Sequence, residues 1–241
     1  MVFAMLPIPS LQVSASSACY ALGYVAGAAA YAGMAKRRGI ATAGIMALLG
    51  SGLIGGLVGA YTGQWIVGGA AGKSILGAVA GGYLAVHFHK RYLGIIRPTG
   101  DLFAVAVSAG EAVGRWGCYF GGCCYGKAAA VPWAIWQHGA YRHPSQIYLS
   151  LSALAILTVL LRFDRSRPPE NALFFLQGLL FCVARFAVEF FRDVAPAALG
   201  LTAAQWACFF GAAFFGTGFL RIMARRKPAA PACAAETARV R

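Results

Sequence analysis

Long apolar stretches alternate with short polar segments along the whole chain. A helix needs about 20 largely apolar residues to cross a bilayer, so each stretch predicts a membrane-spanning helix. Seven such stretches lie at about residues 14–34, 40–60, 74–89, 101–117, 145–161, 171–190 and 203–222. The third, fourth and sixth are short or carry charges, and Thr62 to Gly72 could form a half-inserted segment or a loop, so six or eight helices stay open.

Composition supports the same fold class. The chain is 59% hydrophobic and 12% charged with a mean hydropathy of +0.65, which lies outside the range of soluble domains and predicts an all-α polytopic integral membrane protein. The net charge of +14 does not indicate a nucleic-acid partner, because the basic residues form short clusters between uncharged stretches.

These basic clusters predict the orientation, because cytoplasmic loops are enriched in Lys and Arg. An external N-terminus places most of them inside, namely Lys36, Arg37, Arg38, Lys90, Arg91, Arg97, Arg162, Arg165, Arg167 and those after Leu220. Lys73, Lys127, Arg142 and Arg192 stay outside. The prediction is therefore an external N-terminus and a cytoplasmic C-terminus.

The chain is expected to form one domain with a tail. Residues 1–222 are expected to form a single transmembrane domain, and the Ala-, Pro- and Arg-rich residues 223–241 a disordered basic cytoplasmic tail. Met1 to Ala35 carries no charge, so the basic segment of a cleavable signal peptide is missing and this stretch is expected to remain. Pairs such as Gly23 with Gly27 predict close helix contacts.

Ionisable residues within apolar helices mark the first candidate site, because burying charge in a membrane is costly. Glu111 and Arg115 are spaced i,i+4, as are Arg185 and Glu189. Each pair can therefore neutralise itself as a purely structural device. Alternatively, the two guanidinium groups could converge on one anion, since their forked donors suit phosphate.

A glycine-rich segment, Trp116 to Lys127, follows Arg115 and predicts irregular backbone in a small outer head between the fourth and fifth helices. Its free N–H groups could hold an anionic headgroup, or the segment could be a tight interfacial turn. Arg142 and His143 are placed to meet a lipid phosphate, and Ser145 is explained equally well as a helix cap.

The seven cysteines predict neither a zinc site nor a redox pair. They show no CxxC spacing and no matching histidines, so the sequence predicts small, compact side chains and no metal.

Three blocks of residues together resemble the prolipoprotein diacylglyceryl transferase family. They are Gly114-Arg115-x-Gly117-x-x-x-x-Gly122-x-x-Tyr125-Gly126, Arg142-His143-Pro144-Ser145-Gln146-x-Tyr148, and Arg185-Phe186-x-Val188-Glu189-Phe190-Phe191-Arg192. The resemblance covers the chain from about Tyr20 to Leu220. It implies a multi-pass enzyme of the bacterial inner membrane, with the glycine-rich head in the periplasm.

The implied activity is transfer of a diacylglyceryl group from phosphatidylglycerol to the lipobox cysteine of a preprolipoprotein, releasing glycerol phosphate without a cofactor. The partners are then phosphatidylglycerol, the signal peptide of the preprolipoprotein and membrane lipids. The implied catalytic residues are Arg115, Arg185, Glu189, Tyr20 and His143. The implied phosphatidylglycerol-binding residues are Arg115, Gly117, Cys118, Gly122, Gly126, Arg142, Ser145, Gln146 and Arg185.

The chain departs from the family pattern at several positions. Leu76-Gly77-Ala78 stands where the family has His-Gly-Gly, Cys118 and Cys123 replace an asparagine and a glutamate, and Leu149 replaces an acid. The acceptor thiol is then activated either by His143 or by no side-chain base at all. Three alternatives stay open. The lost histidine would fit a paralogue with another acceptor. A transporter or channel would use the intramembrane charges as a polar path, and a membrane thiol oxidoreductase would rely on Cys118, Cys123 and Cys124.

Overall fold

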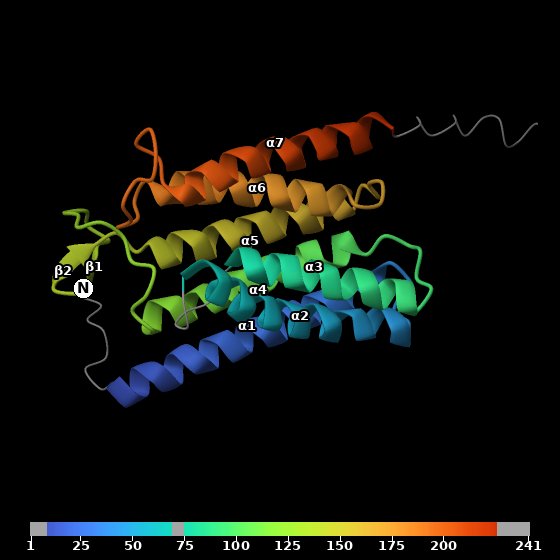
Figure 1. Cartoon of the computed structure of the whole chain (residues 1–241), viewed down its shortest axis with the longest axis horizontal. Coiled ribbons are helices and arrows are strands. Elements are labelled where there is room, and N and C mark those ends of the chain that lie inside the picture. The colour runs from blue at the N-terminus through green and yellow to red at the C-terminus, as the bar shows by residue number, and fades with distance from the viewer. Residues whose placement is uncertain (1–8, 69–74, 226–241) are drawn as a thin grey trace, which may run out of the picture.

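The computed structural model describes residues 9–68 and 75–225, which are mostly helical. The helices are α1 (Pro9–Arg37), α2 (Ala43–Gly68), α3 (Ile75–Tyr92), α4 (Gly100–Phe120), α5 (Ser145–Asp164), α6 (Ala172–Glu189) and α7 (Ala203–Ala224). They run side by side along the long axis, and a β-hairpin protrudes at one end (Figure 1).

Within the described ranges, α1, α2, α5, α6 and α7 are long and apolar enough to cross a membrane. Helix α3 ends in basic residues and α4 contains three charged ones, so these two are less apolar. The helical content and the five apolar helices confirm the prediction of an all-helical, multi-pass membrane protein. Each predicted apolar stretch overlaps one of the helices.

Two predicted boundaries were wrong. Helix α2 continues to Gly68, so Thr62 to Gly68 is not a loop, while the rest of that segment, to Gly72, lies outside the described residues. Helix α4 continues to Phe120, so Trp116 to Phe120 is regular helix and not irregular backbone. The glycines do not break this helix because they face α1 at close range instead of turning the chain.

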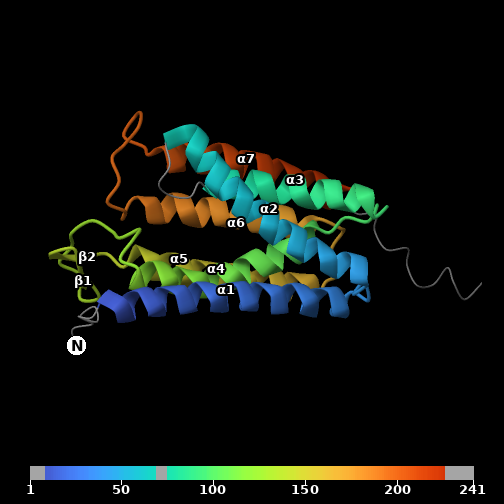
Figure 2. The same ribbon diagram turned by 60° about the horizontal axis from the view of Figure 1, so that its bottom comes forward.

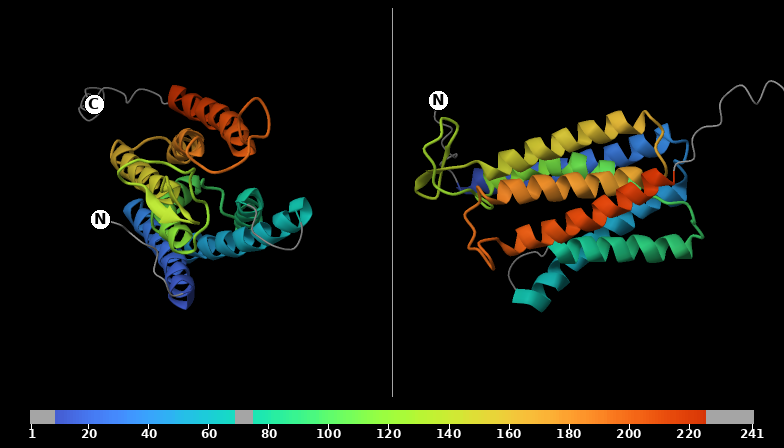
Figure 3. Two further views of the ribbon diagram at one scale, coloured as in Figure 1. Left: turned by 90° about the vertical axis from the view of Figure 1, so that its left-hand side faces the viewer. Right: turned by 90° about the horizontal axis from the view of Figure 1, so that it is seen from above.

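Helix α4 lies at the centre of the bundle. Helices α1, α5 and α6 all pack against it, whereas α2 pairs mainly with α3, and α6 also pairs with α7 (Figures 2 and 3). Side chains on α4 therefore face three neighbouring helices, which makes α4 the element best placed to organise a site.

Glycines lie where two helices approach each other closely, as the sequence predicts; these contacts are called glycine seams below. A methyl carbon on Gly23 of α1 would lie 2.9 Å from the carbonyl oxygen of Gly110 on α4. One on Gly59 of α2 would lie 2.9 Å from Cα of Gly81 on α3. In both places backbone meets backbone, so no larger residue fits without a shift of the helices.

The hairpin between α4 and α5 consists of β1 (Ile135–Gln137) and β2 (Ala140–Arg142), paired antiparallel with Trp136 opposite Tyr141. Its two-residue turn has positive φ at His138 (48°) and Gly139 (76°), as a type I′ turn requires.

A charge network lies at the end of the bundle opposite the hairpin. The buried carboxylate of Asp101 accepts hydrogen bonds from Nη1 of Arg38 at 2.7 Å and from the backbone N–H groups of Asn171 and Phe174 at 3.1 and 3.0 Å. Arg38 also donates to Asp164 at 2.8 Å. This network joins the end of α1 to the starts of α4 and α6 and to the end of α5.

We expect Asp101→Ala to lower the free energy of unfolding by about 3–5 kcal/mol, because it leaves a largely buried guanidinium short of a partner. Glu170→Ala is the matched control. It breaks the Arg97–Glu170 ion pair, whose side chains are 51% and 47% exposed, and should cost less than about 1 kcal/mol. Unfolding in detergent micelles measures both variants, and equal losses would contradict the structural role of Asp101.

Candidate functional site

Two arginine–glutamate pairs lie on α4 and α6 in the half of the bundle nearer the hairpin. Nε and Nη2 of Arg115 both donate to Oε1 of Glu111, one turn earlier on α4, and the Nε distance is 2.9 Å. Both side chains are about 85% shielded from solvent, with exposed fractions of 14% and 15%. The pairing predicted from the i,i+4 spacing is therefore present.

Glu189 of α6 is the hub of the second cluster. Its carboxylate lies 2.8 Å from Nη2 of Arg185 and 3.3 Å from Nη1 of Arg192, and it accepts a hydrogen bond from the hydroxyl of Thr202 at 3.3 Å. The side chain of Glu189 is only 1% exposed. One carboxylate thus joins the end of α6 to the start of α7.

The two clusters lie on helices that pack against each other, with Arg115 on α4 and Arg185 on α6. Arg115 also lies one turn before Cys118, at the end of α4 where three thiols gather.

Three thiols gather at the end of α4. The Sγ atoms of Cys118, Cys123 and Cys124 all lie within 4.8 Å of one another. The hydroxyl of Tyr20 on α1, itself 39% exposed, donates to Sγ of Cys118 at 3.3 Å. Hydrogen bonds to Cys118 and Cys124, together with burial, raise the pKa of the Cys123 thiol. The sequence suggested these three cysteines as a possible redox group but predicted no metal site, because their spacing matches no standard metal-binding motif.

The loop after α4 is held by its own backbone. The amides of Gly121, Gly122 and Cys123 donate to carbonyl oxygens in the last turn of α4, and that of Gly126 donates to the carbonyl of His143. These four N–H groups are therefore not free to bind an anion, contrary to the interpretation from the glycine content. Positive φ at Gly122 (64°) and Cys124 (60°) turns the chain out of the helix.

Ser145 and Gln146 fix this loop from the start of α5. The hydroxyl of Ser145 donates to the carbonyl of Cys124 at 2.6 Å, and Nε2 of Gln146 donates to the carbonyl of Cys123 at 2.8 Å. Both residues are fully buried. Ser145 is not a helix cap, because Pro144 occupies that position and the Ser145 hydroxyl bonds the loop instead.

Arg142 braces the hairpin. Its guanidinium donates to the carbonyl of Gln137 at 3.1 Å and to Asp193 at 2.7 Å, and it lies 4.8 Å from the ring centroid of Tyr125. These contacts join the hairpin to the loop before it and to the segment after α6. His138, which sequence reasoning did not consider, bonds the carbonyl of Gly122 through Nε2 at 2.7 Å.

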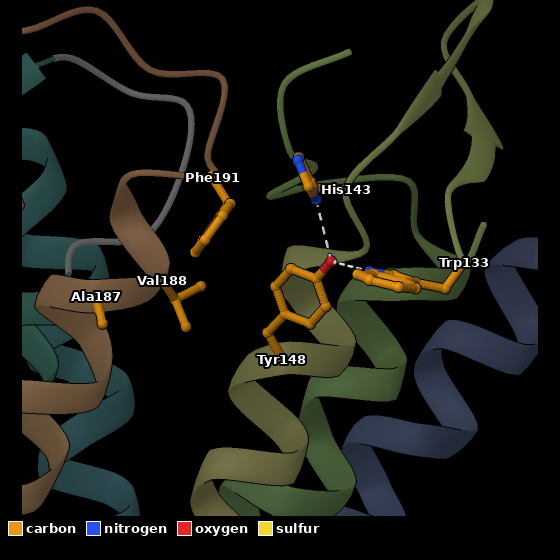
Figure 4. A pocket seen from close by; sticks show the side chains of 6 residues that line it. All are labelled: Trp133, His143, Tyr148, Ala187, Val188 and Phe191. Carbon is orange, nitrogen blue, oxygen red and sulfur yellow. Dashed lines mark hydrogen bonds between the residues drawn. The ribbon is translucent and has the colours of Figure 1, made fainter. Parts of the chain in front are cut away.

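His143 lines an open cavity of about 360 Å³ between the head and α6 (Figure 4). Nδ1 of His143 lies 3.1 Å from the hydroxyl of Tyr148, which also accepts a hydrogen bond from Nε1 of Trp133 at 2.7 Å. Ala187, Val188 and Phe191 form the opposite, apolar side of the cavity. His143 is thus oriented by Tyr148 within a mainly apolar wall.

The signature glycines have a steric reason. A methyl carbon on Gly117 would lie 2.9 Å from the ring of Tyr20, and one on Gly126 would lie 2.7 Å from the carbonyl oxygen of Phe191. Gly117 therefore lets α1 approach α4, and Gly126 lets the head lie against the end of α6.

The fold and these clusters define a class: a multi-pass membrane protein with two largely buried arginine–glutamate pairs on packed helices. The family model described as prolipoprotein diacylglyceryl transferase matches residues 4–221. The chain belongs to the prolipoprotein diacylglyceryl transferase family.

Individual relatives agree with this assignment. The chain is similar to the phosphatidylglycerol–prolipoprotein diacylglyceryl transferases of Campylobacter lari, with 33% identity over 55% of this chain and 49% of the relative, and of Idiomarina loihiensis, with 36% identity over 55% and 52%. A relative from Streptomyces coelicolor, phosphatidylglycerol–prolipoprotein diacylglyceryl transferase 1, is 30% identical over 65% of this chain and 48% of its own length. The chain spans about half the length of these relatives.

We expect Gly126→Ala to disrupt the head, because the new methyl group meets the backbone of both His143 and Phe191. Gly33→Ala on α1 is the control, since no atom lies within 4 Å of that methyl position and alanine favours a helix over glycine by up to about 1 kcal/mol. Limited proteolysis of the head in folded protein measures the effect. Equal protease resistance in Gly126→Ala and wild type would contradict the close packing.

Proposed function

We propose that this chain transfers a diacylglyceryl group from phosphatidylglycerol to the lipobox cysteine of a preprolipoprotein. The observation that carries the proposal is that two largely buried arginine–glutamate pairs, built around Arg115 and Arg185, lie on the packed helices α4 and α6. Membership of the family supports it. The proposed location is the bacterial inner membrane, with the hairpin end of the bundle facing the periplasm.

The chemistry explains why two arginines are needed. The acceptor sulfur attacks the glyceryl carbon that bears the phosphate ester, the C–O bond breaks, and the electron pair stays on the phosphate oxygen. Glycerol phosphate leaves with more negative charge than it carried in the lipid. Preorganised guanidinium groups stabilise that charge as it develops, and a site shielded from water strengthens the effect.

The glutamates keep the arginines in place. Glu111 accepts hydrogen bonds from Nε and Nη2 of Arg115, so the donors on Nη1 are those that would bind the phosphate. Glu189 holds Arg185 from one side. Each pairing offsets much of the cost of burying a guanidinium before the lipid arrives.

The other proposed residues act around this centre. Tyr20 and Cys118 lie at the same end of α4 as Arg115. Gly117, Gly122, Gly126, Ser145, Gln146 and Arg142 shape the loop and the head. His143 lies in the cavity wall, hydrogen-bonded to Tyr148, so a role in orienting the head or the acceptor fits it better than a role as general base.

We expect Arg115→Lys and Arg185→Lys each to lower turnover by at least about a hundredfold, because an ammonium group cannot reproduce the forked donors of arginine. The assay is release of glycerol phosphate from phosphatidylglycerol vesicles supplied with a lipobox peptide. Arg97→Lys, at the opposite end of the bundle, should retain full activity. Wild-type turnover in both Arg115→Lys and Arg185→Lys would refute the phosphate role, and peptide-independent ion flux without release would favour a transporter.

The orientation is tested separately. Because the basic residues in the last turns of α1, α3, α5 and α7 all lie at one end of the bundle, a reporter fused after Arg241 should be cytoplasmic, and one inserted at Ala129 should be external. Insertion at Ser166, between α5 and α6, is a cytoplasmic control. The opposite location at Arg241 or Ala129 would overturn the proposed topology.

A further inference from the structure

The three-thiol cluster at the end of α4 has the geometry of a metal site. Zinc–sulfur bonds of about 2.3 Å place ligand sulfurs about 3.8–4.0 Å apart. The Sγ atoms of Cys118, Cys123 and Cys124 already lie within 4.8 Å of one another, so small side-chain rotations bring them to that spacing. Soft thiolate ligands favour thiophilic cations such as zinc over magnesium or calcium.

We propose that Cys118, Cys123 and Cys124 bind one zinc ion, and that the fourth coordination position receives the thiol of the acceptor cysteine. This inference rests on the proposed function for its acceptor and on the cluster geometry for its metal. The metal was not expected from the sequence, because three ligands contributed by a helix end and the loop after it become a set only in the folded chain.

The loop holds the ligands in place before a metal binds. The carbonyl groups of Cys123 and Cys124 are fixed by the buried side chains of Gln146 and Ser145. Tyr20 donates a hydrogen bond to Sγ of Cys118, and such a contact to a ligand atom fixes the direction in which that atom faces a metal. Arg115 offsets part of the negative charge of three thiolates.

The ligand number points to a reactive site and not a purely structural one. Structural zinc sites are closed by four protein ligands, whereas reactive sites keep one position open. Among the described residues the cluster comprises three cysteines and no fourth His, Cys, Asp or Glu. Cys123 is exposed, so the open position can be reached from outside the bundle.

An open position on zinc supplies what the reaction needs. A free thiol has a pKa of about 8.5 and is only a few per cent ionised at neutral pH. Coordination releases the thiol proton to solvent and leaves a thiolate on the metal. That sulfur forms the new bond to the glyceryl carbon as the C–O bond breaks, and the phosphate oxygen keeps the electron pair, so no oxidant or reductant is required.

Metal binding is tested first, without any activity assay. Purified, reduced protein is equilibrated with zinc, and with cobalt(II) as a spectroscopic probe, and bound metal is counted by elemental analysis. We expect one zinc per chain and intense thiolate-to-cobalt charge-transfer bands. Cys118→Ser, Cys123→Ser and Cys124→Ser should each weaken binding at least tenfold, whereas Cys19→Ser on α1 should not.

Folding defects are separated from ligand loss by Cys123→His, which replaces one zinc ligand by another and should keep the metal but change the cobalt spectrum. Wild type that binds no more zinc than the triple serine variant would overturn the proposal. So would a disulfide between two of the three cysteines in protein that cannot be loaded with zinc.

The role of the metal is tested with the glycerol phosphate assay. Zinc-loaded protein should show little change in rate between about pH 7 and 9, whereas zinc-free protein should gain about tenfold per pH unit below the thiol pKa of about 8.5. Equal rates and pH profiles with and without zinc would refute the acceptor role while leaving the proposed function intact. Zinc binding with no transfer under any condition would instead refute the proposed function and, with it, the acceptor role.

Discussion

A buried carboxylate in an apolar bundle must find cations or donors for both of its oxygens, and Glu189 meets this requirement from three different segments. Arg185 lies one turn earlier on α6, Arg192 follows the end of that helix, and Thr202 begins α7. Removing Glu189 would leave two guanidinium groups facing each other with no counter-ion. The distance between α6 and α7 at this end, and the direction of Arg185, therefore both depend on one side chain.

The need to pair buried polar groups also explains which residues of the head hold its shape and which could contact a substrate. Arg142, Ser145 and Gln146 have the residue types of ligand-binding groups, yet the guanidinium of Arg142, the hydroxyl of Ser145 and Nε2 of Gln146 all donate to carbonyl groups of the loop and hairpin. A short two-stranded hairpin is barely stable by itself. The head keeps its shape because three polar side chains hold it from inside, which leaves the arginines and thiols of α4 and α6 as the groups that can meet a substrate.

Much of the fold could be predicted from the sequence, and the failures have physical causes. The positions of the seven helices follow from hydropathy, and the pairing of Arg115 with Glu111 follows from helical spacing. The end of α4 was misjudged because Gly114 and Gly117 suggest a broken helix, whereas they are the contact surface for α1. The contact of Thr202 with Glu189 depends on how the chain turns back between α6 and α7, and the meeting of three cysteines depends on the shape of the turn that follows α4, which hydropathy and helical spacing do not specify.

The glycine seam between α2 and α3 sets a limit on how this sequence can diverge. At Gly59 and Gly81, a single added carbon meets the backbone of the other helix and not the movable end of a side chain. A larger residue on one helix cannot be accommodated by a smaller one on the other, because the facing residue is already a glycine. Such positions do not tolerate gradual change, whereas the loop after α4 carries exposed side chains such as that of Cys123, which can be replaced without moving a helix.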